Sequence, residues 1–150
     1  MDRIFAVNCK GVFHVAQEGV KGMLADGKGG VIINLASIAG VVAVRDRLAY
    51  TTSKFAIVGL TKALALDHSH TGVRFNAICP CRVETPWVLE RLKEYPDPAA
   101  AYREMASTQL NGRMARPDEI AAAALYLAAD ESAMVTGTNF NLDGGWTAGK

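Results

Sequence analysis

The alternation of short strand-like runs with long helical segments constrains the fold of this chain most. Residues 31–35 form a nearly continuous apolar run, the pattern of a strand buried on both faces of a parallel sheet. Further strands are predicted at residues 73–78, before Pro80, and at residues 138–142. Helical segments precede and separate these strands. The pattern predicts an α/β domain with three parallel strands, right-handed crossovers and helices on both faces.

Apolar periodicity locates the predicted helices. Residues 2–25 carry two adjoining apolar stripes, and the helix predicted at residues 49–68 is apolar all round in its middle. Both patterns indicate helices that are covered on more than one side. A helix is also predicted from residue 117 to about residue 129, with proline and acids in its first turn. Residues 84–116 are polar, interrupted by prolines and rich in short helical pieces.

Composition limits the class of protein. The 150 residues are enough for one domain with a real core, and 50% of them are hydrophobic. The net charge of +1, with both signs mixed along the chain, predicts neither a nucleic-acid partner nor an acidic one. The apolar runs are shorter than the roughly 18–20 residues of a membrane span, so no membrane partner is predicted. The absence of a signal-peptide pattern and the three cysteines favour a reducing cytoplasm.

The residues with the clearest chemistry are Tyr50 and Lys54, four positions apart on a predicted helix and therefore on one face. Tyrosine in water loses its proton only near about pH 10, too high for efficient acid–base catalysis at neutral pH. A cation at about 4 Å favours the phenolate by roughly 4 kcal/mol at an effective dielectric of 20. Ser37, thirteen residues upstream, could hold the carbonyl or alcohol oxygen that exchanges this proton. Without such partners, the pair would be an ordinary exposed helix pair.

Several other segments stand in a characteristic order around these residues. They surround Asn8 (residues 7–11), Ser37 (33–40), Asn76 (76–80), Thr85 (83–86) and Asp143 (142–145). With Tyr50-x-x-x-Lys54, this order and spacing resemble the short-chain dehydrogenase/reductase family over essentially all of residues 1–150. The resemblance implies a partial Rossmann-like, doubly wound sheet. It also implies an NAD(P)-dependent oxidoreductase that interconverts an alcohol and a carbonyl.

The resemblance assigns a role to each matching residue. Tyr50 becomes the general acid/base, Ser37 orients the reacting oxygen, and Lys54 favours the phenolate and bonds the nicotinamide ribose. Asn8 holds a water in the proton relay. The residues that lie over the nicotinamide are Pro80, Val83 and Thr85. The substrate is expected to be a small hydroxylated or carbonyl compound, and segments 82–87 and 112–114 look most like those of sugar or sugar-acid dehydrogenases.

Two departures from the family pattern affect the cofactor. The family's usual Pro-Gly appears as Pro80-Cys81, and the added Cβ and sulfur put the placement of the nicotinamide in question. The sequence has no G-x-x-x-G-x-G or G-x-G-x-x-G segment, although the pyrophosphate of a dinucleotide needs such a glycine-rich turn. The chain therefore resembles the catalytic half of a reductase: a single truncated domain, residues 1–150, with residues 84–116 as a variable substrate lid. We expect impaired or absent activity for this fragment, and NAD cannot be distinguished from NADP.

The sequence also predicts self-association and leaves alternative functions open. Segments 2–25 and 49–68 resemble the helices of the family's four-helix dimer interface, so a homo-oligomer is predicted. The strand at 31–35 should have one bare edge, which favours pairing or aggregation. A non-enzymatic interaction module remains an alternative. Hydrolysis with Ser37 as the nucleophile is a weaker alternative, because no Gly-x-Ser-x-Gly motif surrounds this serine. The pairs Cys79/Cys81 and His68/His70 are too sparse to predict a metal.

Overall fold

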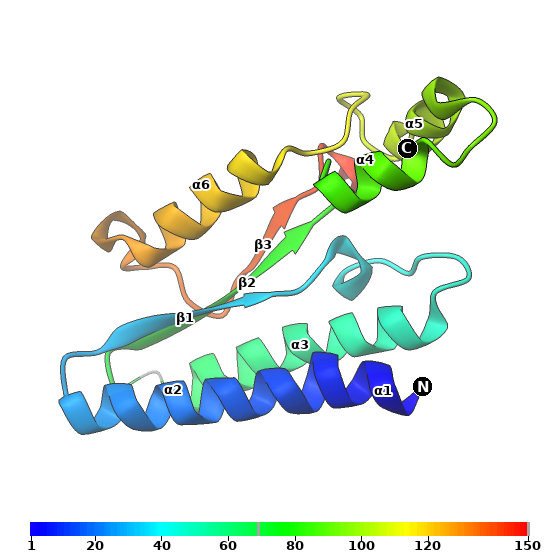
Figure 1. Ribbon diagram of the computed structural model, residues 1–150. Coiled ribbons are helices and arrows are strands. Elements are labelled where there is room, and N and C mark those ends of the chain that lie inside the picture. Colours follow the sequence, from blue (N-terminus) through cyan, green and yellow to red (C-terminus); the bar gives the residue numbers. More distant parts are fainter. Residues whose placement is uncertain (69, 150) are drawn as a thin grey trace.

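A three-stranded parallel sheet forms the centre of the molecule (Figure 1). The computed structural model describes residues 1–68 and 70–149. The strands β1 (Gly30–Leu35), β2 (Val73–Pro80) and β3 (Asn139–Leu142) lie in the order β1-β2-β3. All pairings are parallel. The predicted α/β fold with a partial Rossmann-like sheet is confirmed.

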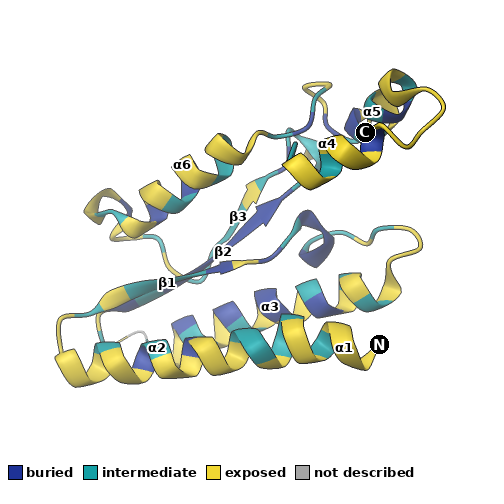
Figure 2. Ribbon diagram, in the orientation of Figure 1, coloured by how far each residue is buried: buried dark blue, intermediate teal, exposed yellow. Residues whose placement is uncertain are grey.

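Helices cover both faces of this sheet. The helices α2 (Val12–Asp26) and α3 (Leu48–Asp67) lie side by side on one face, and α6 (Pro117–Ala128) lies on the other (Figure 1). The central strand β2 is buried along nearly its whole length, and the exposed residues gather on the outer helix surfaces (Figure 2). This burial explains why the strands lack the polar alternation of a solvated sheet.

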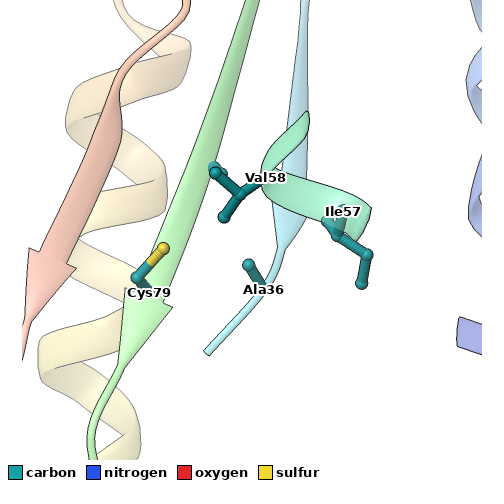
Figure 3. Packing of buried hydrophobic residues seen from close by; sticks show 5 residues of the cluster. Ala36, Ile57, Val58 and Cys79 are labelled. Atoms are coloured by element: carbon teal, nitrogen blue, oxygen red, sulfur yellow. The ribbon is translucent and has the colours of Figure 1, made fainter. Parts of the chain in front are cut away.

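The core divides into clusters on the two sides of β2. Toward α2 and α3, one cluster joins Phe75 to Val20 and Ala65. The second cluster on this face contains Ala36, Ile57, Val58, Ala77 and Cys79, from the end of β1, from α3 and from β2 (Figure 3).

On the opposite face, β2 packs against α6. Ile78 contacts Ala123 and Leu127, and all three side chains are buried. Successive residues of a strand point to opposite faces. Ile78 and Cys79 therefore bury their side chains in different layers, which fixes the position of β2 between α3 and α6.

The first helical segment differs from the continuous α-helix predicted at residues 2–25. It consists of α1 (Asp2–Phe5), a π-helical turn η1 (Ala6–Gly11) and α2. Apolar periodicity does not detect such a turn, which is rare and often found at functional sites. Asn8 lies within it. The segment ends at Gly27, whose positive φ of 69° suits the residue that follows a helix.

Residues 84–116 contain two short helices, α4 (Pro86–Leu92) and α5 (Pro98–Ala106). Each begins with proline, and each has a side-chain cap, from Thr85 and Asp97 respectively. A separate buried cluster holds this region together: Leu92, Ala101, Ala106 and Met114. The region therefore packs on its own small core at the carboxyl ends of the strands (Figure 1).

Short 3₁₀ turns complete the fold: η2 (Ile38–Gly40) follows β1, η3 (Asp130–Ser132) follows α6, and η4 (Trp146–Ala148) follows β3. In the part of the chain that the structure describes, β1 pairs only with β2 and its outer edge is open. None of the helices described is both long and apolar enough to cross a lipid bilayer.

Candidate active site

A cavity of about 210 Å³ lies where the carboxyl ends of β1 and β2 meet the start of α3. In open parallel sheets, this edge is the usual place for a ligand. The side chains lining the cavity are polar or charged at Ser37, Arg47, Tyr50, Cys81 and Arg82, and apolar at Ile38, Ala39, Val44 and Trp146. The structure thus brings the predicted residues Ser37 and Tyr50 to one cavity.

Ser37 is held just beyond the end of β1. Its backbone is extended, and its Oγ accepts a hydrogen bond of 3.1 Å from the Ala39 amide at the start of η2. The hydroxyl proton is therefore not used by this bond and can be donated to a ligand oxygen. Gly40 lets this turn approach α3 closely, because a Cβ there would lie 2.7 Å from the Lys54 carbonyl oxygen. The short approach places Ser37 opposite the first turns of α3.

Tyr50 and Lys54 project from the same face of α3, as their spacing predicts. The Lys54 Nζ lies 5.7 Å from the centroid of the Tyr50 ring and donates a hydrogen bond of 3.0 Å to the Leu35 carbonyl. The Lys54 ammonium is thus fixed between the tyrosine and the end of β1. Burial lowers the pKa of Lys54, although the nearby thiols of Cys79 and Cys9 act in the opposite direction.

Asn8 reaches α3 on a different side from the cavity. Its Nδ2 donates a hydrogen bond of 3.0 Å to Ser53 Oγ, and Ser53 Oγ donates one of 2.7 Å to the Tyr50 carbonyl. Asn8 is therefore linked to Tyr50 through Ser53 and does not line the cavity. The role of Asn8 in holding a relay water stays a prediction.

The residues predicted to lie over a nicotinamide occupy the segment that leads from β2 to α4. Pro80 is the last residue of β2 and pairs with Leu142. Val83 forms a bridge with Ala115, and Thr85 caps α4. None of the three lines the cavity, whereas Cys81 and Arg82, between them, do.

Cys81 does not need the backbone freedom of a glycine. The non-glycine residue with positive φ among those described is Asp46, so Cys81 adopts an ordinary conformation. Its amide donates a hydrogen bond of 2.9 Å to the Leu142 carbonyl. Burial raises the pKa of the Cys81 thiol, which favours the neutral form. The substitution therefore adds a neutral sulfur to the cavity lining without straining the backbone.

Sequence reasoning missed Arg47, Arg82 and Trp146 as cavity residues. Arg47 could have been noticed, because it stands three residues before Tyr50. Trp146 could not, because the turn after β3 brings it from the far end of the chain. Asp143 organises that turn by accepting bonds from the Gly145 amide and from the Thr147 amide and hydroxyl.

The residues present fit one end of a dinucleotide better than the other. Tyr50, Lys54 and the segment after Pro80 provide polar groups suited to a nicotinamide and its ribose. The turn after β3 contains two glycines, but its amides are already used: the Gly145 amide donates a bond of 3.0 Å to Asp143 Oδ1, and the Trp146 amide donates one of 3.1 Å to the Asp143 carbonyl. The chain thus fits the nicotinamide end and has no glycine-rich cradle for a pyrophosphate.

The possible metal ligands do not assemble into a site within residues 1–68 and 70–149, where no three metal-ligating side chains gather. All three cysteines are free. His68 stacks on Phe75, with ring centroids 5.7 Å apart. Ser69, which separates the two histidines, lies outside the described residues.

Comparisons with known proteins give the family. A family model described as enoyl-(acyl carrier protein) reductase matches residues 1–147. The chain is 43% identical over 142 residues to dehydrogenase/reductase SDR family member 6 of Xenopus laevis, covering 94% of this chain and 58% of the relative. It is 38% identical over 147 residues to 2-keto-3-deoxy-L-fuconate dehydrogenase of Xanthomonas campestris, covering 97% of this chain and 49% of the relative.

Solved structures agree with these relatives. 4-Hydroxyisoleucine dehydrogenase complexed with NADH matches with a TM-score of 0.80 and 33% identity, over 96% of this chain and 58% of that one. A variant of actinorhodin polyketide ketoreductase with NADPH matches with a TM-score of 0.84 and 36% identity, over 93% of this chain and 56% of that one.

The fold and the family match together define the class: this chain belongs to the short-chain dehydrogenase/reductase family. It spans a little over half the length of the first curated relatives that it matches.

Proposed function

We propose that this chain carries the proton-transfer machinery of an NAD(P)-dependent oxidoreductase that interconverts an alcohol and a carbonyl. The observation that carries the proposal is one cavity lined by both Ser37 and Tyr50, with the Lys54 ammonium beside the tyrosine ring. The oxidoreductase names of the relatives support the same class of reaction.

Each of the chain's own residues has a defined task in this proposal. The Ser37 hydroxyl donates a hydrogen bond to the reacting oxygen, which places that oxygen beside the Tyr50 phenol. Tyr50 gives its proton to the oxygen in reduction and takes it back in oxidation. Lys54 favours the phenolate through its charge, and Asn8 completes the proton relay with a water. The nicotinamide, when bound, supplies or accepts the hydride.

We propose that NAD or NADP binds with its nicotinamide end against Tyr50, Lys54, Pro80, Val83 and Thr85. A pyrophosphate normally needs a glycine-rich turn at a helix N-terminus, and this chain has none. Binding by this chain alone should therefore be weak, and its turnover should be impaired or absent. The missing contacts would have to come from another polypeptide segment.

Residues 1–150 are proposed to form one domain, with residues 84–116 as its substrate lid. The separate core of Leu92, Ala101, Ala106 and Met114 supports the lid, because it is formed by residues of this segment alone. The cytoplasm remains the proposed compartment, since all three cysteines are free.

We also propose a homo-oligomer formed through α1, α2 and α3. An apolar groove of about 500 Å³ lies between η1 and α2 on one side and α3 on the other. It is lined by Cys9, Lys10, Phe13, His14, Ala56, Ile57 and Leu60. Phe13 in this groove is 44% exposed, and Phe55 on α3 is 45% exposed. Large exposed apolar side chains beside an apolar groove are typical of an interface between subunits.

Calorimetric titration of the purified chain with NAD(H) and NADP(H) tests the proposal. The Lys54→Ala variant removes the cation beside Tyr50, and Lys62→Ala, on the same helix but bonded to the Gly137 carbonyl, is the matched control. Binding that only Lys54→Ala weakens would support a nicotinamide site. No binding at millimolar nucleotide would contradict cofactor binding by this chain and favour the alternative role in assembly.

A further inference from the structure

Two arginines line the cavity that contains Ser37 and Tyr50. Arg47 stands immediately before α3, and Arg82 follows β2 directly after Cys81. The two side chains therefore come from segments 35 residues apart in the sequence (82 minus 47) and meet at one opening. Among the residues that the structure describes, no acidic one lines this cavity.

Neither arginine forms an ion pair with any residue that the structure describes. Three of the nine arginines, Arg91, Arg113 and Arg116, form ion pairs, whereas Arg47 and Arg82 belong to the six without one among the described residues. The positive charges at the cavity thus lack a carboxylate of their own among residues 1–68 and 70–149.

Two acids close to Cys81 are engaged by other groups. Asp143 and Glu119 are the carboxylates that act on Cys81. Asp143 accepts bonds from Gly145 and Thr147. Glu119 receives two bonds, of 2.6 and 2.9 Å, from Arg113. Neither carboxylate forms an ion pair with Arg47 or Arg82.

We propose that the substrate is a small oxo or hydroxy acid, whose carboxylate is held by Arg47 and Arg82 while its reacting oxygen lies between Ser37 and Tyr50. The planar guanidinium group matches a carboxylate with paired hydrogen bonds. The remaining lining, Ile38, Ala39, Val44 and Trp146, is apolar and suits a short aliphatic linker. The position of the reacting oxygen rests on the proposed function, but the carboxylate contact does not.

Trp146 provides a direct readout of binding, because it lines the cavity. The chain has two tryptophans, so a Trp87→Phe background leaves Trp146 as the only indole. The probes are 4-oxopentanoate and its methyl ester, which differ in the charge of one group. Fluorescence is titrated without nucleotide for Trp87→Phe alone and for three double variants. These variants add Arg47→Gln, Arg82→Gln or Arg45→Gln to Trp87→Phe. Arg45 is the matched control, an exposed arginine that does not line the cavity.

We expect the oxo acid to bind more tightly than its ester, and either cavity variant to weaken the acid about tenfold or more, as loss of a charge-assisted hydrogen bond predicts. The ester and the Arg45→Gln variant should show no such change. Equal binding of acid and ester, no binding of the acid at millimolar concentration, or an equal effect of Arg45→Gln would overturn the proposal. Far-ultraviolet circular dichroism establishes that each variant is folded.

Nucleotide titrations of the same variants distinguish a carboxylate site from a phosphate site. If Arg47→Gln and Arg82→Gln weaken NADP but not the oxo acid, the arginines hold a nucleotide phosphate and the proposal is wrong. If the acid binds through the arginines but nucleotide titration fails, the proposed oxidoreductase function falls while the anion site stands. If the chain instead turns over neutral ketones and neither arginine variant changes that turnover, the oxidoreductase function stands and the anion site falls.

Discussion

The hydroxyl of Ser53 donates a hydrogen bond of 2.7 Å to the backbone carbonyl of Tyr50. Ser53 is fully buried, and its oxygen also accepts a bond of 3.0 Å from Asn8. A continuous polar link therefore runs from the π-helical turn η1 to the first turn of α3. This link sets the position of the backbone that carries the proposed catalytic tyrosine.

Replacing Ser53 should cost more stability than replacing its neighbour Thr52. Ser53→Ala removes both bonds and leaves the Asn8 amide without its partner, so we expect a loss of about 1–2 kcal/mol in the free energy of unfolding. Thr52→Ala, which removes an exposed bond to the Leu48 carbonyl, should stay within about 0.5 kcal/mol. Urea denaturation of the three proteins measures both values. Equal losses would show that the link contributes nothing.

The burial of Lys54 predicts a stability difference that depends on pH. Burial lowers the pKa of Lys54 in the folded chain from 10.5. At a pH below this folded-state pKa the buried ammonium is charged, which destabilises the folded chain. This destabilisation disappears as the pH rises through the folded-state pKa toward 10.5, because the folded chain then loses the proton before the unfolded chain does. The free energy of unfolding of the wild type should therefore rise relative to Lys54→Met between neutral pH and about pH 10. Parallel denaturation series give the difference, and a fall over this range would contradict the burial.

Glu119 should stabilise the start of α6 only while it is ionised. Hydrogen bonds from Arg113 and the Arg116 amide lower its pKa from 4.5 to about 2. A depressed carboxyl pKa gives stability that is present above the unfolded value and lost as pH falls through the folded one. Glu119→Gln should thus be less stable than the wild type at about pH 6, with the difference shrinking toward about pH 2. Asp118→Gln is an exposed neighbouring control, and a constant difference for Glu119→Gln would argue against the pair.

Placing glycine at position 81 should trade stability for cofactor access. Since Cys81 has an ordinary backbone conformation, Cys81→Gly adds chain entropy to the unfolded state and should cost about 0.5–1 kcal/mol. Removal of the side chain from the cavity should strengthen NAD(P) binding in calorimetry. Cys81→Ala separates the two effects, because it removes the sulfur but keeps the Cβ. Weaker nucleotide binding by the glycine variant would show that the thiol does not obstruct the site.

The groove between the helices predicts where association can be disrupted. Ala56→Arg places a long charged side chain in the apolar groove formed with α2 and should shift the chain toward monomer in sedimentation equilibrium. Leu125→Arg adds the same charge at a 72% exposed position on α6 and should leave association unchanged. A wild type that is monomeric at all concentrations would contradict the proposed oligomer.

Local pattern was sufficient for much of the fold. The apolar run now seen in β1 and the proline at the start of α6 were visible in the sequence because strand burial and helix starts leave local signals. The π-helical turn around Asn8 was not visible, because apolar periodicity distinguishes helix from strand but does not identify the hydrogen-bond pattern of a single turn. The predicted face shared by Tyr50 and Lys54 followed from helix geometry alone.

Residue patterns alone predict the order of strands and helices, the family and the spacing that pairs Tyr50 with Lys54. They do not predict that Asn8 contacts Ser53, or that Arg47, Arg82 and Trp146 share a cavity with Ser37, and these contacts emerge from the folded structure. The physical reason is that periodicity and motif spacing report neighbours within one element. Contacts between elements depend on how the strand ends, α3 and the turn after β3 pack together around the sheet.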